Sequence, residues 1–313
     1  MDIKKLDERP ILNVNIPIKV KSMGHITELQ YMEKRNHKQT VQMLPGLNEN
    51  GKREYVVIDS GEVKECNKYT SRADNYIGLK RTFQKCRDLI NTNVTDVNNV
   101  RWITLTYQEN MTDTKRLYKD FEHFNKRFQR YCIKQDYGKA EYIVMMEPQG
   151  RGAWHCHLLY IWSHKSPYIA NDILRDIWGQ GFVKIKKLDN VDNVGAYLTA
   201  YLGDMEITDD SDLSKQNFKL KVVDIENDKG VLETKRFIKG GRLHMYPPKF
   251  NMIRYSRGLK KPTVEYMSYK NAEKKVSDAT LTYETSFSIS DKENNYSNII
   301  NVRYFNSVKS KSE

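Results

Sequence analysis

The sequence has no long apolar run. No stretch approaches the roughly 18 apolar residues that a transmembrane helix needs. The N-terminal segment Met1–Lys5 also lacks the apolar core that is typical of a signal peptide. The mean hydropathy is −0.74. We therefore expect a soluble, cytoplasmic protein with no membrane partner.

Cysteine is scarce and widely spaced. The chain has 4 cysteines in 313 residues, and no C-x-x-C motif brings two of them together. This spacing argues against a zinc finger and against a disulfide framework, so we expect reduced thiols. No internal repeat is visible, and the length suits one large domain or a core domain with accessory regions.

Acidic residues are outnumbered by basic ones. The chain carries 52 Lys and Arg against 40 Asp and Glu, which gives a net charge of +12 and a pI near 9.3. A polyanion is the natural partner of such a chain. Because the sequence offers no membrane segment, nucleic acid is favoured over a membrane surface.

The most informative stretch is the strand-like run from Trp154 to Trp162, which contains His155 and His157. A strand places residues i and i+2 on one face, so both imidazoles can point to one place. Chance alone gives about 0.16 His-x-His pairs for 7 histidines in 313 residues. The pair therefore suggests a metal site, and two hydrogen-bonded core histidines are the alternative.

A second strand-like run, Glu141–Pro148, precedes the histidine strand across a short glycine-containing loop, which predicts a β-hairpin. If Glu147 lies opposite His155, its carboxylate shares the histidine face, whereas a slip of one residue would move it to the other face. Two imidazoles and one carboxylate leave coordination positions open, as a catalytic metal site requires, and they suit Mg²⁺ or Mn²⁺. A solvated strand end is the alternative interpretation of Glu147.

The remaining pattern predicts the fold class. Helices are expected where apolar residues recur at helical spacing, over about 76–91, 113–132, 169–178 and 189–202. Further strands are expected over 102–107 and 181–188. The order β, α, β, β, α, β, α after the first helix predicts an α+β fold, with a mostly antiparallel central sheet flanked by helices and related to the split βαβ arrangement.

Two regions flank this block. Residues 1–75 are polar and turn-rich and form an N-terminal accessory region of unknown role. Residues 206–313 form a C-terminal accessory region, in which the polar segment from about 270 onwards is expected to be partly disordered despite the strand-like run 299–305.

The last predicted helix carries Tyr197 and Tyr201, whose spacing puts both phenols on one helix face. With 20 tyrosines, about 1.3 such pairs are expected by chance. The tyrosine pair therefore gains its weight only from the elements that precede it.

The strand 102–107, the hairpin with Glu147, His155 and His157, and the tyrosine helix follow one another in that order. In this order they resemble the three motifs of the HUH endonucleases and, more narrowly, the rolling-circle replication initiators of bacteriophages and small plasmids. The resemblance covers roughly residues 76–205, with a weaker likeness over 241–262.

The resemblance implies a DNA-nicking domain over 76–205. His155 and His157 would bind the divalent metal, with Glu147 as the third ligand. A motif tyrosine would attack the scissile phosphate, giving a covalent 5′-phosphotyrosine and a free 3′-OH that primes synthesis. A phenol can act in this way because it is first a nucleophile and later a leaving group.

The tyrosine motif departs from the family pattern in one respect. In related initiators a lysine often lies three residues after a motif tyrosine, and here those positions are Ala200 and Asp204. The departure leaves open whether Tyr197 and Tyr201 are both catalytic and which of them attacks first. A packing or substrate-positioning role for one phenol is the alternative.

Several basic residues are candidates for DNA contacts. Arg151 lies in the hairpin loop, and Lys184 and Lys186 share one face of the strand 181–188, with a solvated surface as the alternative for all three. The segment 246–261 mixes basic and aromatic side chains, which suits phosphate contact and base stacking, although a structural flap is the alternative. Its candidate cations are Arg254, Arg257, Lys260 and Lys261.

Together these features predict a metal-dependent initiator of rolling-circle DNA replication that nicks and rejoins single-stranded or supercoiled origin DNA. No helicase motif occurs in the sequence, so a host helicase would unwind the duplex and a host polymerase would extend the 3′-OH. An HUH transposase or mobilisation relaxase is the nearest alternative. A noncatalytic origin-binding or copy-control protein with structural histidines is an alternative of a different class. The sequence leaves open the plasmid or phage source and the oligomeric state.

Overall fold

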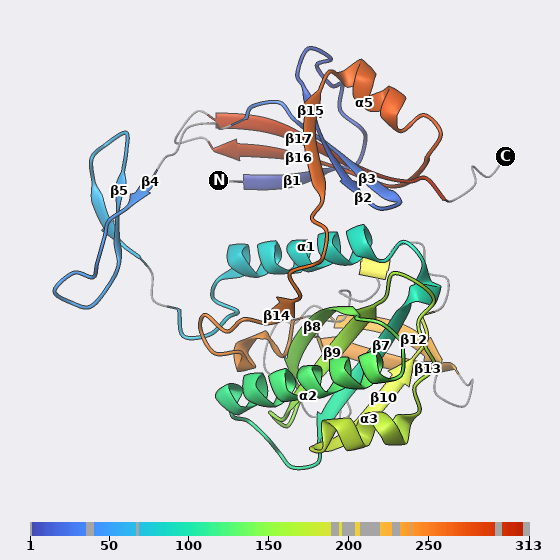
Figure 1. The fold of residues 1–313 in the computed structure, drawn as a ribbon. Coiled ribbons are helices and arrows are strands. Elements are labelled where there is room, and N and C mark those ends of the chain that lie inside the picture. The colour runs from blue at the N-terminus through green and yellow to red at the C-terminus, as the bar shows by residue number, and fades with distance from the viewer. Residues whose placement is uncertain are drawn as a thin grey trace. The chain divides into compact units, whose positions relative to one another are not determined.

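The computed structural model describes residues 2–35, 41–66, 69–188, 194–195, 204–206, 220–226, 232–238, 240–291 and 296–308. The chain divides into two compact units. The first contains residues 1–20, 28–70 and 265–305, and the second contains residues 21–27, 71–264 and 306–313. Helices and antiparallel sheets together confirm the predicted α+β class (Figure 1).

The second unit is built around a five-stranded antiparallel sheet with the strand order β10-β7-β9-β8-β14. Its strands are β7 (Val100–Tyr107), β8 (Glu141–Pro148), β9 (Trp154–Ile161), β10 (Gly181–Lys186) and β14 (Ile253–Tyr255). Its helices are α1 (Tyr76–Asn93), α2 (Thr114–Lys134) and α3 (Asn171–Trp178), with short 3₁₀ turns at Val97–Asn99 and Leu243–Met245. The predicted elements from 76 to 188 are therefore confirmed in type and order.

Helix α2 determines which face of this sheet is covered. Asp113 caps its start by accepting from the backbone N–H groups of the first turn. Its buried side chains, including Phe121 and Phe128, recur every three or four positions and pack on the sheet (Figure 1). The rings of Phe128 and Tyr160 lie 4.3 Å apart. Because strand residues alternate between faces, α2 covers the even-numbered face of β9 and leaves the face that bears His155 and His157.

A three-stranded sheet with the order β11-β13-β12 completes the described part of the second unit. Its strands are β11 (Met205–Glu206), β12 (Leu220–Glu226) and β13 (Leu232–Ile238). Most of the predicted acidic linker between β11 and β12 lies outside the described residues.

The first unit is built mainly on a six-stranded sheet with the order β1-β16-β17-β3-β2-β15. These strands are β1 (Asp2–Leu6), β2 (Ile18–Met23), β3 (Ile26–Met32), β15 (Thr263–Met267), β16 (Thr280–Asp291) and β17 (Tyr296–Asn306), and α5 spans Tyr269–Lys275. Ile18, Leu29 and Phe305 belong to its apolar core. A small separate sheet contains β4 (Val41–Met43), β5 (Glu54–Val57) and β6 (Val63–Glu65).

The C-terminal segment corrects the expectation of a partly disordered tail. It forms the long strands β16 and β17 up to Asn306, and β16 pairs with β1 at the other end of the chain. Its polar side chains satisfy one another: the Asn301 amide donates to Ser286 Oγ at 3.0 Å, and Arg303 lies 2.5 Å from Glu273. A polar composition therefore reflects buried hydrogen bonds here, because paired polar groups can be buried at little cost.

Two further expectations concern the whole chain. The four cysteines are free thiols, as their spacing predicts. Within the described ranges, no helix is both long enough and apolar enough to cross a membrane.

Candidate functional site

The β8–β9 hairpin has the register on which the predicted site depends. Glu147 is paired with His155, and Met145 is paired with His157. Side chains of paired residues project from the same face of a sheet, so the carboxylate and both imidazoles share one face. Glu147 Oε2 lies 3.3 Å from His157 Nε2. The predicted register is confirmed.

The hairpin loop fixes this register. The backbone N–H of Gln149 donates to Ala153 O at 2.7 Å, and the N–H of Gly152 donates to Gln149 O at 2.9 Å. Gly152 has φ +90°, a conformation that favours glycine. Arg151 lies exposed at the tip, where its Nε donates to Gln149 Oε1 at 2.9 Å. The loop thus presents one cation close to the histidine strand.

His157 is held on both sides. Its ring stacks on Trp102 of β7 at 5.5 Å between centroids, and it stacks on His155 at the same distance. Thr104 Oγ1 lies 3.3 Å from His157 Nδ1. If Nδ1 carries the proton and donates it to Thr104, the Nε2 lone pair faces Glu147, which is the orientation that a metal-binding histidine needs.

His155 is a neutral imidazole at ordinary pH. Burial, reinforced by the nearby His157, lowers the pKa of His155 to about 4, although Glu147 acts in the opposite direction. Its Nδ1 is buried and has no hydrogen-bond partner within the described residues. A buried ring nitrogen without a partner is costly in a purely structural histidine, whereas a neutral imidazole is the form that binds metal.

Glu147 is held in place by a residue that we did not predict. It is 4% exposed, and its Oε1 lies 2.8 Å from Nη2 of Arg242. The same guanidinium donates from Nη1 to Pro148 O at 3.2 Å and from Nε to the backbone carbonyl of Asp204. Arg242 lies in the segment of weaker family likeness, but its distance in sequence gave no indication that it reaches the hairpin.

The donor chemistry fits a divalent cation. Two imidazoles and a carboxylate lie on one face, one imidazole is neutral with an unpartnered nitrogen, and a second carboxylate oxygen is engaged by Arg242. In the part of the chain that is described, no three His, Cys, Asp or Glu side chains are already arranged as a metal cage. The structure thus supplies the ligand types and their shared face, with Glu147 held by an ion pair.

Tyr197 and Tyr201 lie outside the described residues, but both ends of their segment are described. At the start, Val194 and Gly195 are helical, and the N–H of Gly195 donates to Asn91 Oδ1 of α1 at 2.9 Å. A Cβ at Gly195 would lie 2.6 Å from Arg87 O, so the approach of this segment to α1 requires glycine.

The far end of the tyrosine segment is anchored to the hairpin. Asp204 is 3% exposed, its carbonyl accepts from Arg242, and its Oδ1 accepts from the N–H of Gly240 at 2.8 Å. Because Arg242 also contacts Glu147, one guanidinium links the end of the tyrosine segment to the carboxylate of the candidate metal site.

The predicted basic contacts divide between the two faces of the sheet. On β10, Lys184 is paired with Thr104 and Lys186 with Trp102, so both lysines lie on the histidine face. Phe182 is also on this face, opposite Thr106, and is 64% exposed. The sequence suggested the two lysines but not Phe182, because an apolar residue in an alternating strand usually indicates core.

Four other predicted cations do not join the histidines. Arg254 is paired with Val144, which places it on the α2 face, and Arg257 follows it in the exposed loop. Lys260 is fixed by two hydrogen bonds between its backbone and the side chain of Asn93 on α1. Lys260 and Lys261 are exposed there.

The aromatic residues of the same segment correct part of the base-stacking expectation. Tyr246 and Phe250 are 1% and 7% exposed and pack against the ring of Trp154 at 5.7 and 4.7 Å. They form part of the core because Trp154 projects to the even-numbered face of β9, where they cover it.

Residues 100–206 match the family model of the replication-associated protein ORF2. This segment begins at β7 and ends at β11, so it contains the hairpin, Lys184, Lys186 and the whole tyrosine segment. No curated protein and no solved structure is significantly similar to the chain. The match identifies a replication-associated region, and it excludes the segment that contains Arg242, Arg254 and Arg257.

Proposed function

We propose that this protein initiates rolling-circle DNA replication by nicking and rejoining single-stranded origin DNA at the histidine face of the β8–β9 hairpin. The observation that carries the proposal is the pairing of Glu147 with His155, which puts the carboxylate beside both imidazoles. This pairing lies within the segment that matches the replication-associated family.

The proposed reaction conserves the energy of the DNA backbone. The phenol oxygen of Tyr197 or Tyr201 attacks phosphorus and loses its proton, the P–O3′ bond breaks, and the leaving 3′ oxygen takes up a proton. The products are a 5′-phosphotyrosine and a free 3′-OH. A later attack by a 3′-OH on the phosphotyrosine reverses these steps and rejoins a strand.

Residues of the histidine face have separate roles in this proposal. His155, His157 and Glu147 hold Mg²⁺ or Mn²⁺, which when bound supplies Lewis-acid polarisation of the scissile phosphate. Thr104 orients the ring of His157, and Arg242 orients the carboxylate of Glu147.

The same face offers groups that position a DNA strand. Lys184, Lys186 and the loop residue Arg151 supply positive charge near the histidine strand, and Phe182 supplies an exposed ring for a base. Residues 76–205 form the nicking domain in this proposal. A host helicase and a host polymerase open the duplex and extend the 3′-OH.

The test uses the full-length chain with Mn²⁺ and labelled single-stranded oligonucleotides that tile the DNA flanking its own gene. We expect a denaturation-resistant protein–DNA adduct with one of them. The adduct should disappear in a Tyr197→Phe/Tyr201→Phe variant and persist in Tyr168→Phe, because Tyr168 is an exposed tyrosine in the loop that precedes α3. An undiminished adduct in the double variant would exclude both phenols.

The same experiment separates the alternatives. Specific binding without an adduct from any oligonucleotide supports a noncatalytic origin-binding protein. An adduct that forms only with transposon ends or a transfer origin supports a transposase or a mobilisation relaxase, which shares the chemistry but not the substrate.

A further inference from the structure

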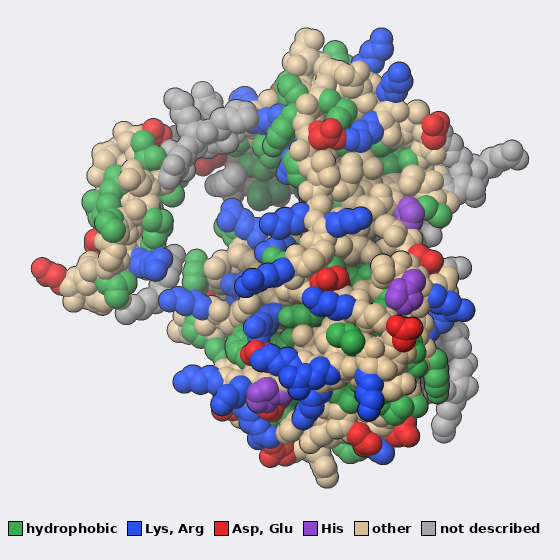
Figure 2. Space-filling view, viewed as in Figure 1, with side chains coloured by type: hydrophobic (Ala, Val, Ile, Leu, Met, Phe, Trp, Pro, Cys, Tyr) green, Lys and Arg blue, Asp and Glu red, His purple; other side chains and the backbone are tan. Residues whose placement is uncertain are grey.

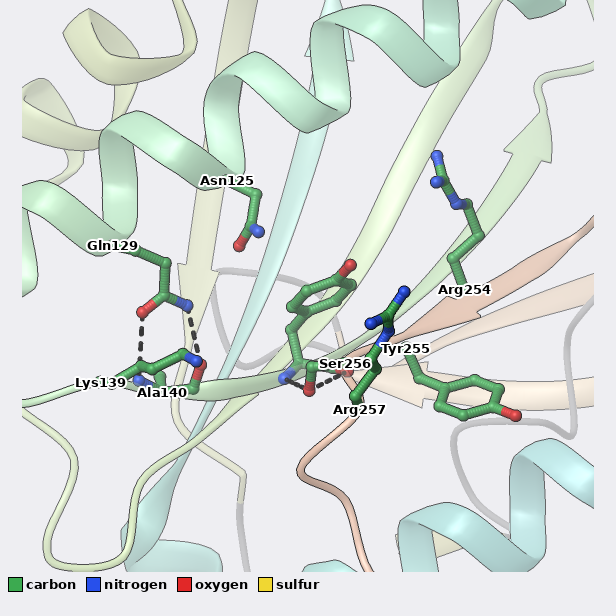
Figure 3. Close-up of a pocket in the computed structure, with 9 residues that line it drawn as sticks. Asn125, Gln129, Lys139, Ala140, Arg254, Tyr255, Ser256 and Arg257 are labelled. Carbon is green, nitrogen blue, oxygen red and sulfur yellow. Dashed lines mark hydrogen bonds between the residues drawn. The ribbon is translucent and has the colours of Figure 1, made fainter.

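A second candidate site lies on the opposite face of the five-stranded sheet. A cavity of about 430 Å³ opens between α2 and the edge formed by β8 and β14, and its size suits a small ligand or one unit of a polymer. Figure 3 shows Asn125 and Gln129 projecting from α2, and Arg254 and Arg257 coming from β14 and the residues after it.

The lining of this cavity is positively charged. Three cations, Lys139, Arg254 and Arg257, line it, and no carboxylate of the described residues does. None of the three forms an ion pair with a described residue, although the guanidinium of Arg254 lies 5.3 Å from the ring of Tyr118. The neighbouring carboxylate of Glu122 is engaged by Lys126 at 2.9 Å. Unpaired cations around a concave surface favour an anion.

The polar wall of the cavity is rigid. Gln129 is fixed by two hydrogen bonds to the backbone of Ala140, and Ser256 Oγ accepts from the N–H of Tyr142 at 2.9 Å. Asn125 Oδ1 accepts from the Tyr160 hydroxyl at 2.8 Å, which fixes its amide and leaves the NH₂ group as a donor for a ligand (Figure 3). The cavity thus combines cations for a phosphate with an oriented donor for a neutral polar group.

We propose that this cavity binds one nucleotide unit of a single-stranded DNA chain, on the face away from the histidines. Arg254, Arg257 and Lys139 contact its phosphate, and the Asn125 amide donates to a polar atom of the sugar or base. The identity of the anion as DNA rests on the proposed function, whereas the anion site itself rests on the cavity.

A polymer fits this surface better than a free nucleotide. Positive charge continues beyond the cavity, since Arg130 is exposed one turn after Lys126 on α2. Figure 2 shows Lys and Arg side chains gathered over the same face of the molecule. Charge that extends past one nucleotide gains affinity only from a strand that runs across it, through release of further counterions. The cavity therefore holds DNA that lies outside the nicking site.

The test measures the affinity of the full-length protein for fluorescent oligothymidylate in EDTA, so that no metal-dependent cleavage contributes. We expect Arg254→Ala/Arg257→Ala to weaken binding roughly tenfold. It should also flatten the slope of log affinity against log salt by about 1.4, which corresponds to two lost phosphate contacts. Lys165→Ala/Arg175→Ala removes the same charge at exposed positions outside the cavity and should change neither quantity by more than about twofold.

A second measurement distinguishes a strand from a free nucleotide. The same variants are titrated with thymidine monophosphate. If the monophosphate binds through Arg254 and Arg257 while oligothymidylate affinity is unchanged, the cavity is a nucleotide site and the strand proposal is wrong. Equal effects of the two double variants would also overturn it.

Failure of the nicking proposal is read separately. His155→Ala/His157→Ala should abolish the protein–DNA adduct but keep the affinity that depends on Arg254 and Arg257. If no adduct ever forms and that affinity persists, the cavity proposal stands alone.

Discussion

Arg242 donates from Nη2 to Glu147 Oε1 across 2.8 Å, and the same guanidinium donates to the carbonyl of Asp204. Glu147 lies on the histidine hairpin, and Asp204 ends the segment that carries the two motif tyrosines. The ion pair is therefore the described contact that joins the candidate ligand set to the segment of the candidate nucleophiles.

Loss of Arg242 should destabilise the protein. In Arg242→Ala the buried Glu147 carboxylate loses its partner, and we expect the free energy of unfolding to fall by about 3 kcal/mol. Chemical denaturation measures this change. Adding Glu147→Gln to Arg242→Ala should restore part of the loss, because a neutral amide is less costly to bury unpaired. A double variant that is less stable than Arg242→Ala would contradict the ion-pair explanation.

Metal affinity should depend on the hairpin ligands. We expect His155→Ala/His157→Ala to abolish Mn²⁺ binding in isothermal titration calorimetry, since it removes both imidazoles. Thr104→Val should weaken binding about tenfold or more, because it removes the partner of His157 Nδ1. His164→Ala serves as the control, since His164 is exposed outside the site. Unchanged Mn²⁺ affinity in the first variant would show that the histidines are structural.

His155, with its pKa lowered to about 4, should remain neutral in the metal-free protein until the pH falls to that value. An unfolded chain protonates the same imidazole near pH 6.5, so the unfolded state binds more protons between these values. His155 therefore makes the folded state less stable as the pH falls from about 6.5 to 4, and it has no effect on stability above that window. The ring-proton NMR shift of His155 against pH checks the value, and a midpoint near the ordinary pKa of histidine, about 6.5, would disprove it.

Phe182 should contribute to DNA binding at the histidine face. Because the ring is 64% exposed and opposite Thr106, it can stack on a base, and stacking contributes about 1–3 kcal/mol per base. We expect Phe182→Ala to weaken single-stranded DNA binding roughly tenfold and Phe182→Trp to retain it. Tyr168→Ala removes another exposed ring, 82% exposed in the loop before α3, and should leave affinity unchanged. Fluorescence anisotropy in EDTA compares the three variants.

Gly195 should be required for the position of the tyrosine segment. A Cβ there would lie 2.6 Å from both Arg87 O and Asn91 Oδ1, so Gly195→Ala must push the segment away from α1. We expect the adduct yield to fall at least about tenfold while Mn²⁺ affinity is retained. Gly150→Ala is the control, since no atom lies within 4 Å of its added Cβ. A normal adduct yield in Gly195→Ala would mean that the segment tolerates the displacement.

The sequence determined the local structure of the second unit. Its apolar spacing predicted α1, α2, α3 and the β8–β9 hairpin, because helical and strand periodicities are properties of neighbouring residues. The pattern His-x-His and the length of the loop also limited Glu147 to two possible registers. The identities and shared face of the candidate ligands could thus be predicted before the fold was known.

Tertiary structure decided what depends on residues far apart in the chain. It chose the register in which Glu147 opposes His155, and it brought Arg242 to that carboxylate from 95 positions away, by the difference of their numbers. It also placed Lys184 and Lys186 on the histidine face and Arg254 on the other, because the order of strands in a sheet is set by packing rather than by periodicity. The polar C-terminal segment became β16 and β17 for the same reason, since buried partners elsewhere in the fold satisfy its polar groups.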